Sequence, residues 1–248
     1  MTIQSIPAFQ KPDIPTDRKA VFDPRDSDPF YTEVVRGLRA KVERRIDSAG
    51  LRTLGVTSAV AGEGKTKTAI QLAVNMASTG RKKVLLMDLD LRKSDLAKEM
   101  RIGVAPGLGE YLSGAVSREE IVRTTSIRGL HLVPAGKPVH SPVDLLAGEK
   151  FRTFLKELRG HFDLLLLDTP PILPVPDAVT ISEQLDAFIL VFRLSFTPYK
   201  LLQQAVDELG AGKILGVVLN GDEKKTDKYY SRYYGSYYKS SAVDRKTS

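Results

Sequence analysis

The stretch 53-TLGVTSAVAGEGKTKTAIQLAVNMAST-79 decides the fold. Its first residues (53–58) are apolar enough for a buried strand, and its last residues (66–79) are typical of a helix that stops at the following glycine. Gly62 and Gly64 lie between them and allow the backbone to curl until its N–H groups point inward. Inward N–H groups and the N-terminus of a helix attract anions. The order of strand, glycine-rich turn and helix therefore predicts a phosphate-binding loop.

Two side chains at the end of this loop have the chemistry of a nucleotide site. Lys65 is long enough to reach the β- and γ-phosphates, and the hydroxyl of Thr66 is a suitable ligand for Mg²⁺. Ala59 stands where the general pattern of such loops begins with glycine. A glycine-rich turn without a ligand is the alternative. The strand before the turn, the helix after it and the register of GKT favour a loop that binds ATP with Mg²⁺.

Acidic residues follow two other apolar segments, at the points where strands would end. The segment 84-VLLMDLDLR-92 carries Asp88 and Asp90, and 164-LLLLDTPP-171 carries Asp168. Ligands of doubly wound sheets bind beyond the carboxyl ends of the strands, so we expect these carboxylates to converge near the phosphate loop. Mg²⁺ needs only one or two of them, which leaves one to orient or deprotonate a nucleophile. Simple solvation of acids at strand ends is the alternative, and two such strands beside a phosphate loop argue against it.

The rest of the chain continues the alternation of strands and helices. Further strands are predicted at 83–90, 129–134, 162–168, 187–192 and 214–220, and further helices at 142–159, 178–184 and 199–209. Strands joined through helices rather than hairpin turns indicate a parallel sheet. We therefore predict an α/β fold, a doubly wound and mostly parallel sheet with helices on both faces, of the P-loop NTPase type.

The two ends of the chain differ in composition from the predicted domain, 30–221. Residues 1–29 contain five prolines and little apolar periodicity, which predicts an extended arm. Residues 30–47 predict an amphipathic helix. Its apolar residues stand four apart, at Val34, Leu38, Val42 and Ile46. Residues 222–248 are polar and tyrosine-rich, which predicts a mobile tail.

Composition narrows the class of protein and its compartment. The 248 residues include no cysteine, which excludes disulfides and thiolate metal sites, and only three histidines. The net charge of +7 is spread along the chain rather than gathered in a block, so no nucleic acid partner is expected. The N-terminus lacks the apolar core of a signal peptide. We therefore expect a cytoplasmic protein that reaches the inner face of the membrane only through a partner.

Several motifs together resemble the bacterial tyrosine kinases (BY-kinases). AGEGKTKT (61–68) resembles their Walker A motif, VLLMDLDLR their Walker A′ motif and LLLLDTPP their Walker B motif. EVVRGLR (33–39) is similar to their ExxRxxR motif, and DKYYSRYYGSYYKSS (227–241) is similar to their C-terminal tyrosine cluster. The resemblance extends from about Tyr31 to the C-terminus. It implies an ATP-dependent protein-tyrosine autokinase that regulates capsule and exopolysaccharide synthesis.

The resemblance also implies roles for individual residues. The nucleotide-binding loop falls on Gly62, Glu63, Gly64, Lys65, Thr66 and Lys67. The metal site falls on Thr66, Asp90 and Asp168, and activation of the tyrosine hydroxyl falls on Asp88, so that the catalytic set is Lys65, Asp88, Asp90 and Asp168. By similarity with related ATPases, Asn220 either contacts the adenine base or caps the turn at its strand end.

Substrates and partners follow from the same resemblance. The phosphorylated residues would be Tyr229, Tyr230, Tyr233, Tyr234, Tyr237 and Tyr238. The residues that join subunits into a ring would be Glu33, Arg36 and Arg39, unless they simply form a solvated charged face. A transmembrane activator (a polysaccharide co-polymerase) and a tyrosine phosphatase are the other expected partners.

Two departures from the family pattern and two rival functions remain open. Lys67 replaces the small hydroxyl residue usual in the family, and no proline follows Arg92, which is itself either a phosphate contact or a surface residue.

One rival is an ATPase of the partition or septum-placement type, whose extra loop lysine corresponds to Val60 here. The other rival is a scaffold that binds nucleotide and transfers nothing. The tyrosine tail argues against the first, and the intact charged residues argue against the second.

Overall fold

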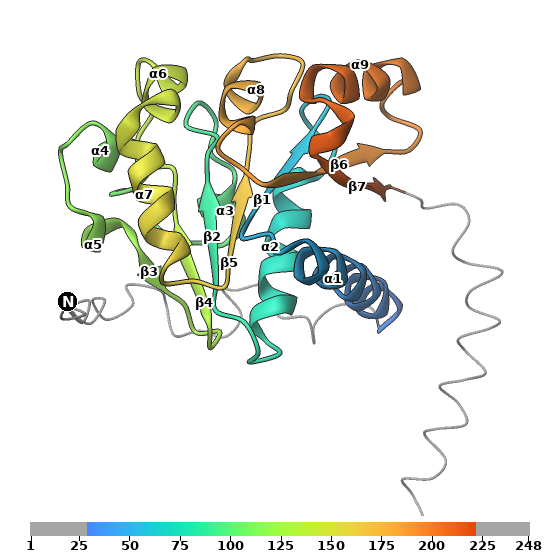
Figure 1. Ribbon diagram of the computed structural model, residues 1–248, viewed down its shortest axis with the longest axis horizontal. Helices are drawn as coiled ribbons and strands as arrows, with labels where there is room; N and C mark the ends of the chain where they lie inside the picture. Colours follow the sequence, from blue (N-terminus) through green and yellow to red (C-terminus); the bar gives the residue numbers. More distant parts are fainter. Residues whose placement is uncertain (1–28, 222–248) are drawn as a thin grey trace, which may run out of the picture.

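A seven-stranded sheet forms the centre of the residues that the computed structural model describes, 29–221 (Figure 1). Its strands are β1 (Thr53–Ser58), β2 (Val84–Asp88), β3 (Arg123–Thr124), β4 (Leu130–Val133), β5 (Leu164–Asp168), β6 (Ala187–Arg193) and β7 (Ile214–Asn220). Their order across the sheet is β3-β4-β2-β5-β1-β6-β7, and every neighbouring pair is parallel except β3 and β4. The predicted doubly wound, mostly parallel α/β fold is confirmed.

Helices cover both faces of this sheet. They are α1 (Pro29–Ala49), α2 (Lys65–Ala77), α3 (Leu96–Glu99), α4 (Leu108–Leu112), α5 (Arg118–Ile121), α6 (Pro142–Ala147), α7 (Glu149–Arg159), α8 (Asp177–Ser182), α9 (Tyr199–Leu209) and the short 3-10 helix η2 (Ala211–Lys213). Apolar residues of α1, α2 and α3 pack with Val84 and Leu86 of β2. Residues of α4 to α9 pack with Leu85 and Met87 of the same strand. Successive residues of a strand thus face opposite helical layers, which explains why the strands are apolar throughout.

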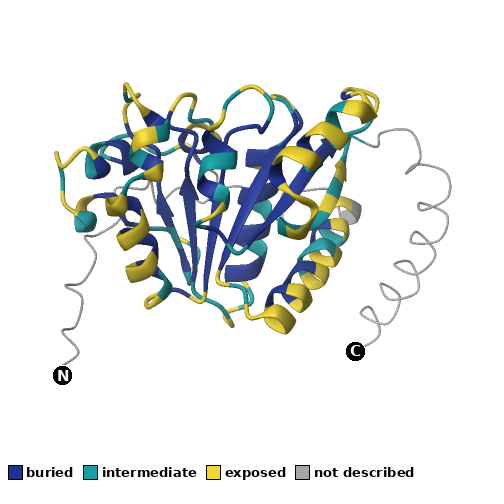
Figure 2. Cartoon of the chain, turned by 45° about the horizontal axis from the view of Figure 1, so that its top comes forward, coloured by how far each residue is buried: buried dark blue, intermediate teal, exposed yellow. Residues whose placement is uncertain are grey.

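The central strands are buried on both faces, whereas the outer sides of the helices are exposed (Figure 2). Close packing across β1 and β6 requires glycine at one position: a Cβ on Gly55 would overlap the ring of Phe188. Asp88 and Asp168 stand opposite each other in the register of β2 and β5. The sheet therefore places two of the predicted site residues side by side, at the carboxyl ends of neighbouring strands.

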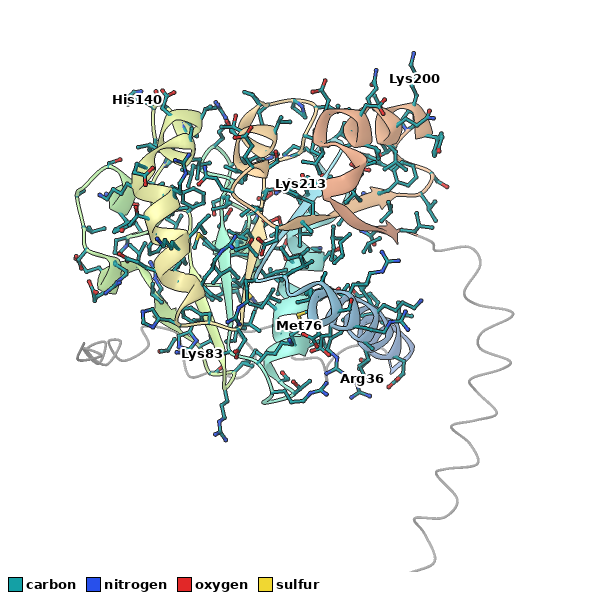
Figure 3. The ribbon with its side chains drawn as sticks, in the orientation of Figure 1. Arg36, Met76, Lys83, His140, Lys200 and Lys213 are labelled. Carbon is teal, nitrogen blue, oxygen red and sulfur yellow. The ribbon has the colours of Figure 1, made fainter. Side chains whose placement is uncertain are left out.

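The structure corrects the predicted burial of the first helix. Val34 is 50% exposed, and Val35 is buried in its place, together with Val42 and Ile46. Four-residue steps advance about 40° around a helix with 3.6 residues per turn, so a strict spacing of four drifts away from the buried side. Arg36 is exposed and lies on the outer side of α1 (Figure 3), whereas Met76 of α2 is buried.

Three other predictions were incomplete. The predicted helix 142–159 is two helices, because Gly148 between them is extended (φ −69°, ψ 157°). The antiparallel strand β3 was missed, since two half-buried residues give no periodic signal. The short helices α3 to α5 were also missed, since four or five residues are too few to show a helical period. No helix among residues 29–221 is long and apolar enough to cross a membrane. The predicted N-terminal arm, apart from Pro29, and the predicted tail lie outside the described residues.

Candidate active site

The phosphate loop joins β1 to α2 and curls as the glycines predicted. Gly62 and Gly64 adopt left-handed backbone conformations, with φ of 86° and 96°. At Gly64 the side-chain amide of Asn220 occupies the place where a Cβ would be, so glycine is needed there for both backbone and space. Helix α2 begins at Lys65, directly after this turn. The loop and the N-terminus of α2 thus form one concave, N–H-rich surface.

Glu63 supports the loop from inside. Its side chain is fully buried, and one oxygen (Oε2) accepts a hydrogen bond from the N–H of Val60 at 2.8 Å. The other oxygen (Oε1) accepts hydrogen bonds from the hydroxyl of Thr197 at 2.7 Å and from the N–H of Arg193 at 3.2 Å. The Glu63 carboxylate therefore ties the loop to the chain after β6. A contact of Glu63 with nucleotide would have to come from its backbone.

Lys65 lies between two of the three predicted carboxylates. Its Nζ is 3.4 Å from Asp90 Oδ2, 3.6 Å from Asp168 Oδ1 and 3.3 Å from the hydroxyl of Thr66. Burial lowers the pKa of Lys65, but the combined charges of the nearby aspartates raise it above its ordinary value. The ammonium group therefore stays charged in a site with little water, where a cation interacts strongly with phosphate oxygens.

Asp88 has a pKa well above that of an ordinary carboxyl group. It is fully buried; its Oδ1 accepts a hydrogen bond from the N–H of Asp90 at 3.0 Å and its Oδ2 one from the hydroxyl of Ser94 at 2.6 Å. Burial and the neighbouring charge of Asp168 raise the pKa of Asp88 to about 8. A carboxylate whose pKa lies this close to neutral pH is suited to exchange a proton with a substrate. Ser94, which orients it, carried no sequence signal.

Asp168 fits the role of a metal ligand. Burial raises its pKa to about 6, although the charge of Lys65 lowers it. Both carboxylate oxygens are buried, and within residues 29–221 Lys65 is the ion-pair partner of Oδ1. The Thr66 hydroxyl, the other predicted metal ligand besides Asp90, is buried at the end of the phosphate loop. Within residues 29–221, no three acidic or imidazole groups form a metal cage. The arrangement suits Mg²⁺, which keeps most of its ligands as water and phosphate oxygens.

Arg92 is not a free phosphate contact in this structure. Its guanidinium binds Asp177 through two hydrogen bonds, Nε to Oδ2 at 2.7 Å and Nη2 to Oδ1 at 3.2 Å. Asp177 is fully buried at the start of α8. The pair joins the segment after β2 to the segment after β5 and thereby steadies the two acid-bearing loops. Asp177 was missed because an acid just before a predicted helix is usually only a cap.

The remaining predicted residues divide between the loop and α1. Lys67 is exposed. Asn220 donates to the backbone oxygen of Glu63 at 2.8 Å and accepts from the N–H of the next residue at 2.9 Å, so its side chain caps the turn. On α1, Arg36 and Glu33 form an exposed ion pair, and Arg39 Nε is buried without a hydrogen bond. The six predicted phosphorylation sites lie outside the described residues.

Comparison with known proteins gives one matching family model and several relatives named as tyrosine-protein kinases. A family model described as an AAA domain matches residues 52–199. The tyrosine-protein kinase CpsD of Streptococcus agalactiae (serotype III, strain NEM316) is 34% identical over 172 residues, which cover 68% of this chain and 74% of that protein. The tyrosine-protein kinase ptk of Acinetobacter johnsonii is 30% identical over 207 residues, 83% of this chain but only 28% of that protein.

Solved structures agree with these relatives. The kinase domain of Escherichia coli tyrosine kinase ETK has 29% identity and a TM-score of 0.72, covering 76% of this chain and 74% of that one. The cell division ATPase MinD of Pyrococcus furiosus, with 22% identity, a TM-score of 0.56 and coverage of 68% of this chain and 70% of that one, shares the fold alone. By its relatives and its fold, the chain belongs to the bacterial tyrosine kinase (BY-kinase) family of protein-tyrosine kinases.

Proposed function

We propose that this protein is an ATP- and Mg²⁺-dependent tyrosine autokinase whose substrates are the six tyrosines of its own C-terminal cluster. The observation that carries the proposal is the position of the Lys65 ammonium, held between Asp90 and Asp168 at the end of the phosphate loop. A buried cation in ion-pair contact with two buried carboxylates suits the binding of ATP phosphates and a metal in one place.

The transfer can be written with each atom accounted for. The phenol oxygen of a tyrosine forms a bond to the γ-phosphorus, the bond from that phosphorus to the β,γ-bridging oxygen breaks, and ADP leaves with the electron pair. Asp88 takes the phenol proton. Lys65 stabilises the negative charge on the phosphate oxygens as the bond breaks. Mg²⁺, held by Thr66, Asp90 and Asp168, would supply further charge neutralisation when bound.

The composition of the tail supports its role as substrate. Three tyrosine doublets stand among Ser, Gly, Lys and Arg, without aliphatic residues that could enclose them in a core. If the segment 227–241 is flexible, its typical end-to-end distance is roughly 20 Å for about 15 residues. Such a reach brings a neighbouring active site within range and raises the effective concentration toward the millimolar range.

We further propose that transfer occurs between subunits of a closed ring. Glu33, Arg36 and Arg39 share one side of α1, where the first two are exposed to a neighbour. The charge of this side suits a seam with acids, or with the nucleotide pocket, of the next subunit. Phosphorylation of the tails would then make them repel one another and the acidic metal site, which would dissociate the ring.

The remaining proposals concern where the protein acts, its partners and the pathway that it regulates. The chain would act at the inner face of the membrane, recruited by a transmembrane activator of the polysaccharide co-polymerase class, and a tyrosine phosphatase would reverse its modification. A relative from Klebsiella pneumoniae is described as a putative tyrosine-protein kinase in the cps region, which supports a role in capsule or exopolysaccharide synthesis and export. We propose no partition or septum-placement function, since no feature of the described residues favours it over the kinase.

One experiment tests the activity. The full chain is incubated with ATP and Mg²⁺, and phosphate on each tyrosine is measured by mass spectrometry. We expect phosphate on the tail doublets and none in a Lys65→Met variant. Phosphate found chiefly on Tyr31, Tyr111 or Tyr199 would contradict the tail as substrate. Equal phosphorylation of wild type and Lys65→Met would contradict the kinase site itself.

A further inference from the structure

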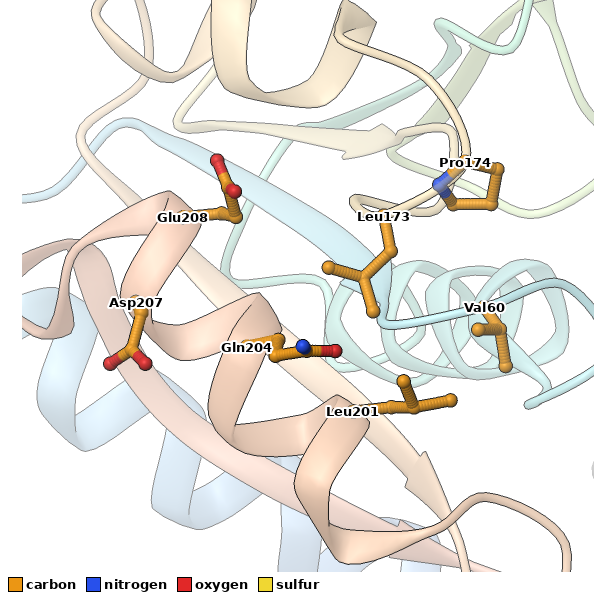
Figure 4. Close-up of a pocket in the computed structure, with 7 residues that line it drawn as sticks. All are labelled: Val60, Leu173, Pro174, Leu201, Gln204, Asp207 and Glu208. Atoms are coloured by element: carbon orange, nitrogen blue, oxygen red, sulfur yellow. The ribbon is translucent and has the colours of Figure 1, made fainter.

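A groove of about 610 Å³ lies between the phosphate loop, the segment after β5 and helix α9 (Figure 4). We call it the α9 groove. It is lined by Val60, Leu173, Pro174, Leu201, Gln204, Asp207 and Glu208. One part of this lining is apolar, and the last turn of α9 adds two exposed carboxylates. The groove therefore offers apolar contact and negative charge side by side.

The groove adjoins the candidate active site through the backbone. Val60 belongs to the phosphate loop itself, two residues before Gly62. The N–H of Leu173 donates to the backbone oxygen of Ala59 at 3.1 Å, so the second wall is attached to the same loop. Asp168 stands only five residues before Leu173 on that wall. An extended peptide in the groove would thus lie beside the loop that is proposed to bind the ATP phosphates.

Among the residues that the structure describes, the two acids of the groove have no ion-pair partner. Neither Asp207 nor Glu208 forms an ion pair with another of the described residues. Their helix contributes no basic side chain to its last turn. Exposed, unpaired carboxylates at the edge of an apolar surface attract a segment that combines large apolar side chains with cations.

The C-terminal segment of this chain has that composition. Each tyrosine doublet has a basic residue directly beside it: Lys228 before the first, Arg232 before the second and Lys239 after the third. Residues 222–248 contain seven basic and four acidic side chains, a net charge of +3. Its aromatic rings match the apolar wall of the groove, and its cations match the two carboxylates.

The last described residue, Gly221, is close to the phosphate loop of the same chain. A Cβ added to Gly221 would stand 3.1 Å from Arg193 Cγ, and Arg193 Nη1 donates to the backbone oxygen of Gly62 at 3.2 Å. Tyr229 follows Gly221 by eight positions, and a fully extended chain of eight steps spans roughly 26 to 29 Å. The described chain therefore ends beside its own phosphate loop, and the first tyrosine of the cluster can lie up to that distance from it.

We propose that the α9 groove is the docking site for the tyrosine-rich segment 227–241 of a second copy. A tyrosine ring packs against Val60, Leu173 and Leu201, and the adjacent Lys or Arg pairs with Asp207 or Glu208. The choice of a second copy rests on the proposed function, in which transfer occurs between subunits. The groove thereby selects tyrosines that have a basic neighbour.

The same charges would release the product. Each phosphotyrosine adds about −1.5 to −2 charges, which Asp207 and Glu208 would repel at close range. An interaction of about 1 kcal/mol between unit charges 4 Å apart in water corresponds to about a fivefold change in affinity. Each phosphate next to the groove should therefore weaken docking by about fivefold or more, so that unmodified tyrosines replace modified ones.

Binding and transfer can be measured separately on the full chain. The receptor is a variant in which all six tail tyrosines are Phe, and the probe is a fluorescent peptide with the sequence 222–241. We expect the double variant Asp207→Lys, Glu208→Lys of this receptor to bind the peptide about tenfold more weakly. A peptide with Lys228→Glu and Arg232→Glu should lose affinity for the original groove and regain it with the reversed groove.

A matched control changes the same amount of charge elsewhere. Asp144 and Glu183 are exposed acids outside the groove, and the double variant Asp144→Lys, Glu183→Lys should alter peptide affinity by less than about twofold. Equal affinities of groove variant, control variant and unchanged receptor would overturn the docking site. Failure of the charge-swapped peptide to recover affinity would overturn pairing at Asp207 and Glu208.

Transfer in the same samples separates this inference from the proposed function. The receptor is mixed with ATP, Mg²⁺ and full-length Lys65→Met chains, whose tails are intact, and phosphate on those tails is measured. Phosphate on the Lys65→Met tails, at a rate reduced by the groove variant, supports docking of a second copy. Normal transfer despite the groove variant overturns the groove but not the kinase. Peptide binding that follows the predicted pattern without any transfer upholds the groove and overturns the kinase.

Discussion

Two groups of opposite charges, both predicted to be functional, are built in opposite ways. Around Lys65, the Asp90 and Asp168 side chains are only 9% and 1% exposed, and the charged atoms stand 3.4 and 3.6 Å apart. On α1, Arg36 and Glu33 are 57% and 34% exposed. Buried charges interact strongly and cannot exchange partners with water, whereas exposed pairs contribute little to their own fold. The first group suits chemistry inside one subunit, and the second is available to another subunit.

The largest expected effect is on the buried group. Lys65→Met removes its only cation, and we expect autophosphorylation to fall by about 100- to 1000-fold, the effect of losing one preorganised charge-stabilising group. Incorporation of labelled phosphate measures this. Lys156→Met is the control, since Lys156 is an exposed lysine on α7 with no role in the proposed site. A similar loss of autophosphorylation in both variants would mean that activity does not depend on the buried position of the Lys65 charge.

The exposed group should affect assembly instead. In the double variant Arg36→Ala, Arg39→Ala we expect loss of the ring, measured as a fall to lower mass in light scattering. The exposed pair Arg152 and Glu149 on α7 has the same i,i+3 spacing, so Arg152→Ala is the control and should leave the mass unchanged. Arg36→Ala and Arg152→Ala should each change the free energy of unfolding of one subunit by less than about 0.5 kcal/mol. A ring that survives the double variant would remove α1 as the seam.

Phosphorylation of the tail should weaken the assembly that the exposed group on α1 is proposed to hold together. The segment 222–248 has a net charge of +3 (seven basic, four acidic), and six phosphotyrosines would bring it to about −6 to −9. We expect fully phosphorylated wild type to dissociate and Lys65→Met to remain a ring. Light scattering on both at low and high salt checks this, because screening should weaken the difference. Equal masses at low salt would refute an electrostatic switch.

The smallest expected effect is the pH dependence of the buried group without nucleotide and Mg²⁺. Folding raises the pKa of Asp88 from 3.8 to about 8, because of burial and the charge of Asp168. The folded state thus holds a proton that the unfolded state has released, and the free energy of unfolding falls as pH rises from about 4 to 8. We expect Tm to fall by several degrees between pH 5 and pH 8.5, at roughly 2 to 4 °C per kcal/mol.

Asp88→Asn provides the control for this measurement. The amide does not titrate, so the fall in Tm over the same pH range should be smaller in this variant than in wild type. A wild-type Tm that is constant or rises over this range would contradict the raised pKa of Asp88. Addition of ATP and Mg²⁺ should also flatten the curve, since positive charge near the carboxylates favours their ionised form.

Much of the site was predictable because its signals are local. The phosphate loop is one contiguous segment, and the acids that it needs follow directly after apolar strands. Parallel strands end at one edge of a sheet, so the convergence of Lys65, Asp90 and Asp168 followed from the order of elements alone. The residues that support the site were not predictable in this way. Ser94, Asp177 and Thr197 act through partners between 6 and 134 positions away.

The sequence by itself determined the alternation of strands and helices, the phosphate loop and the positions of its charged residues. These depend on periodicity and on the conformational freedom of glycine, which are properties of short segments. Only the tertiary structure decided that Glu63 faces inward, that Arg92 pairs with Asp177 and that Val35 rather than Val34 is buried. Each of these depends on which distant surface packs against the segment. Close packing decides which of two neighbouring side chains is buried, where the sequence pattern leaves both equally possible.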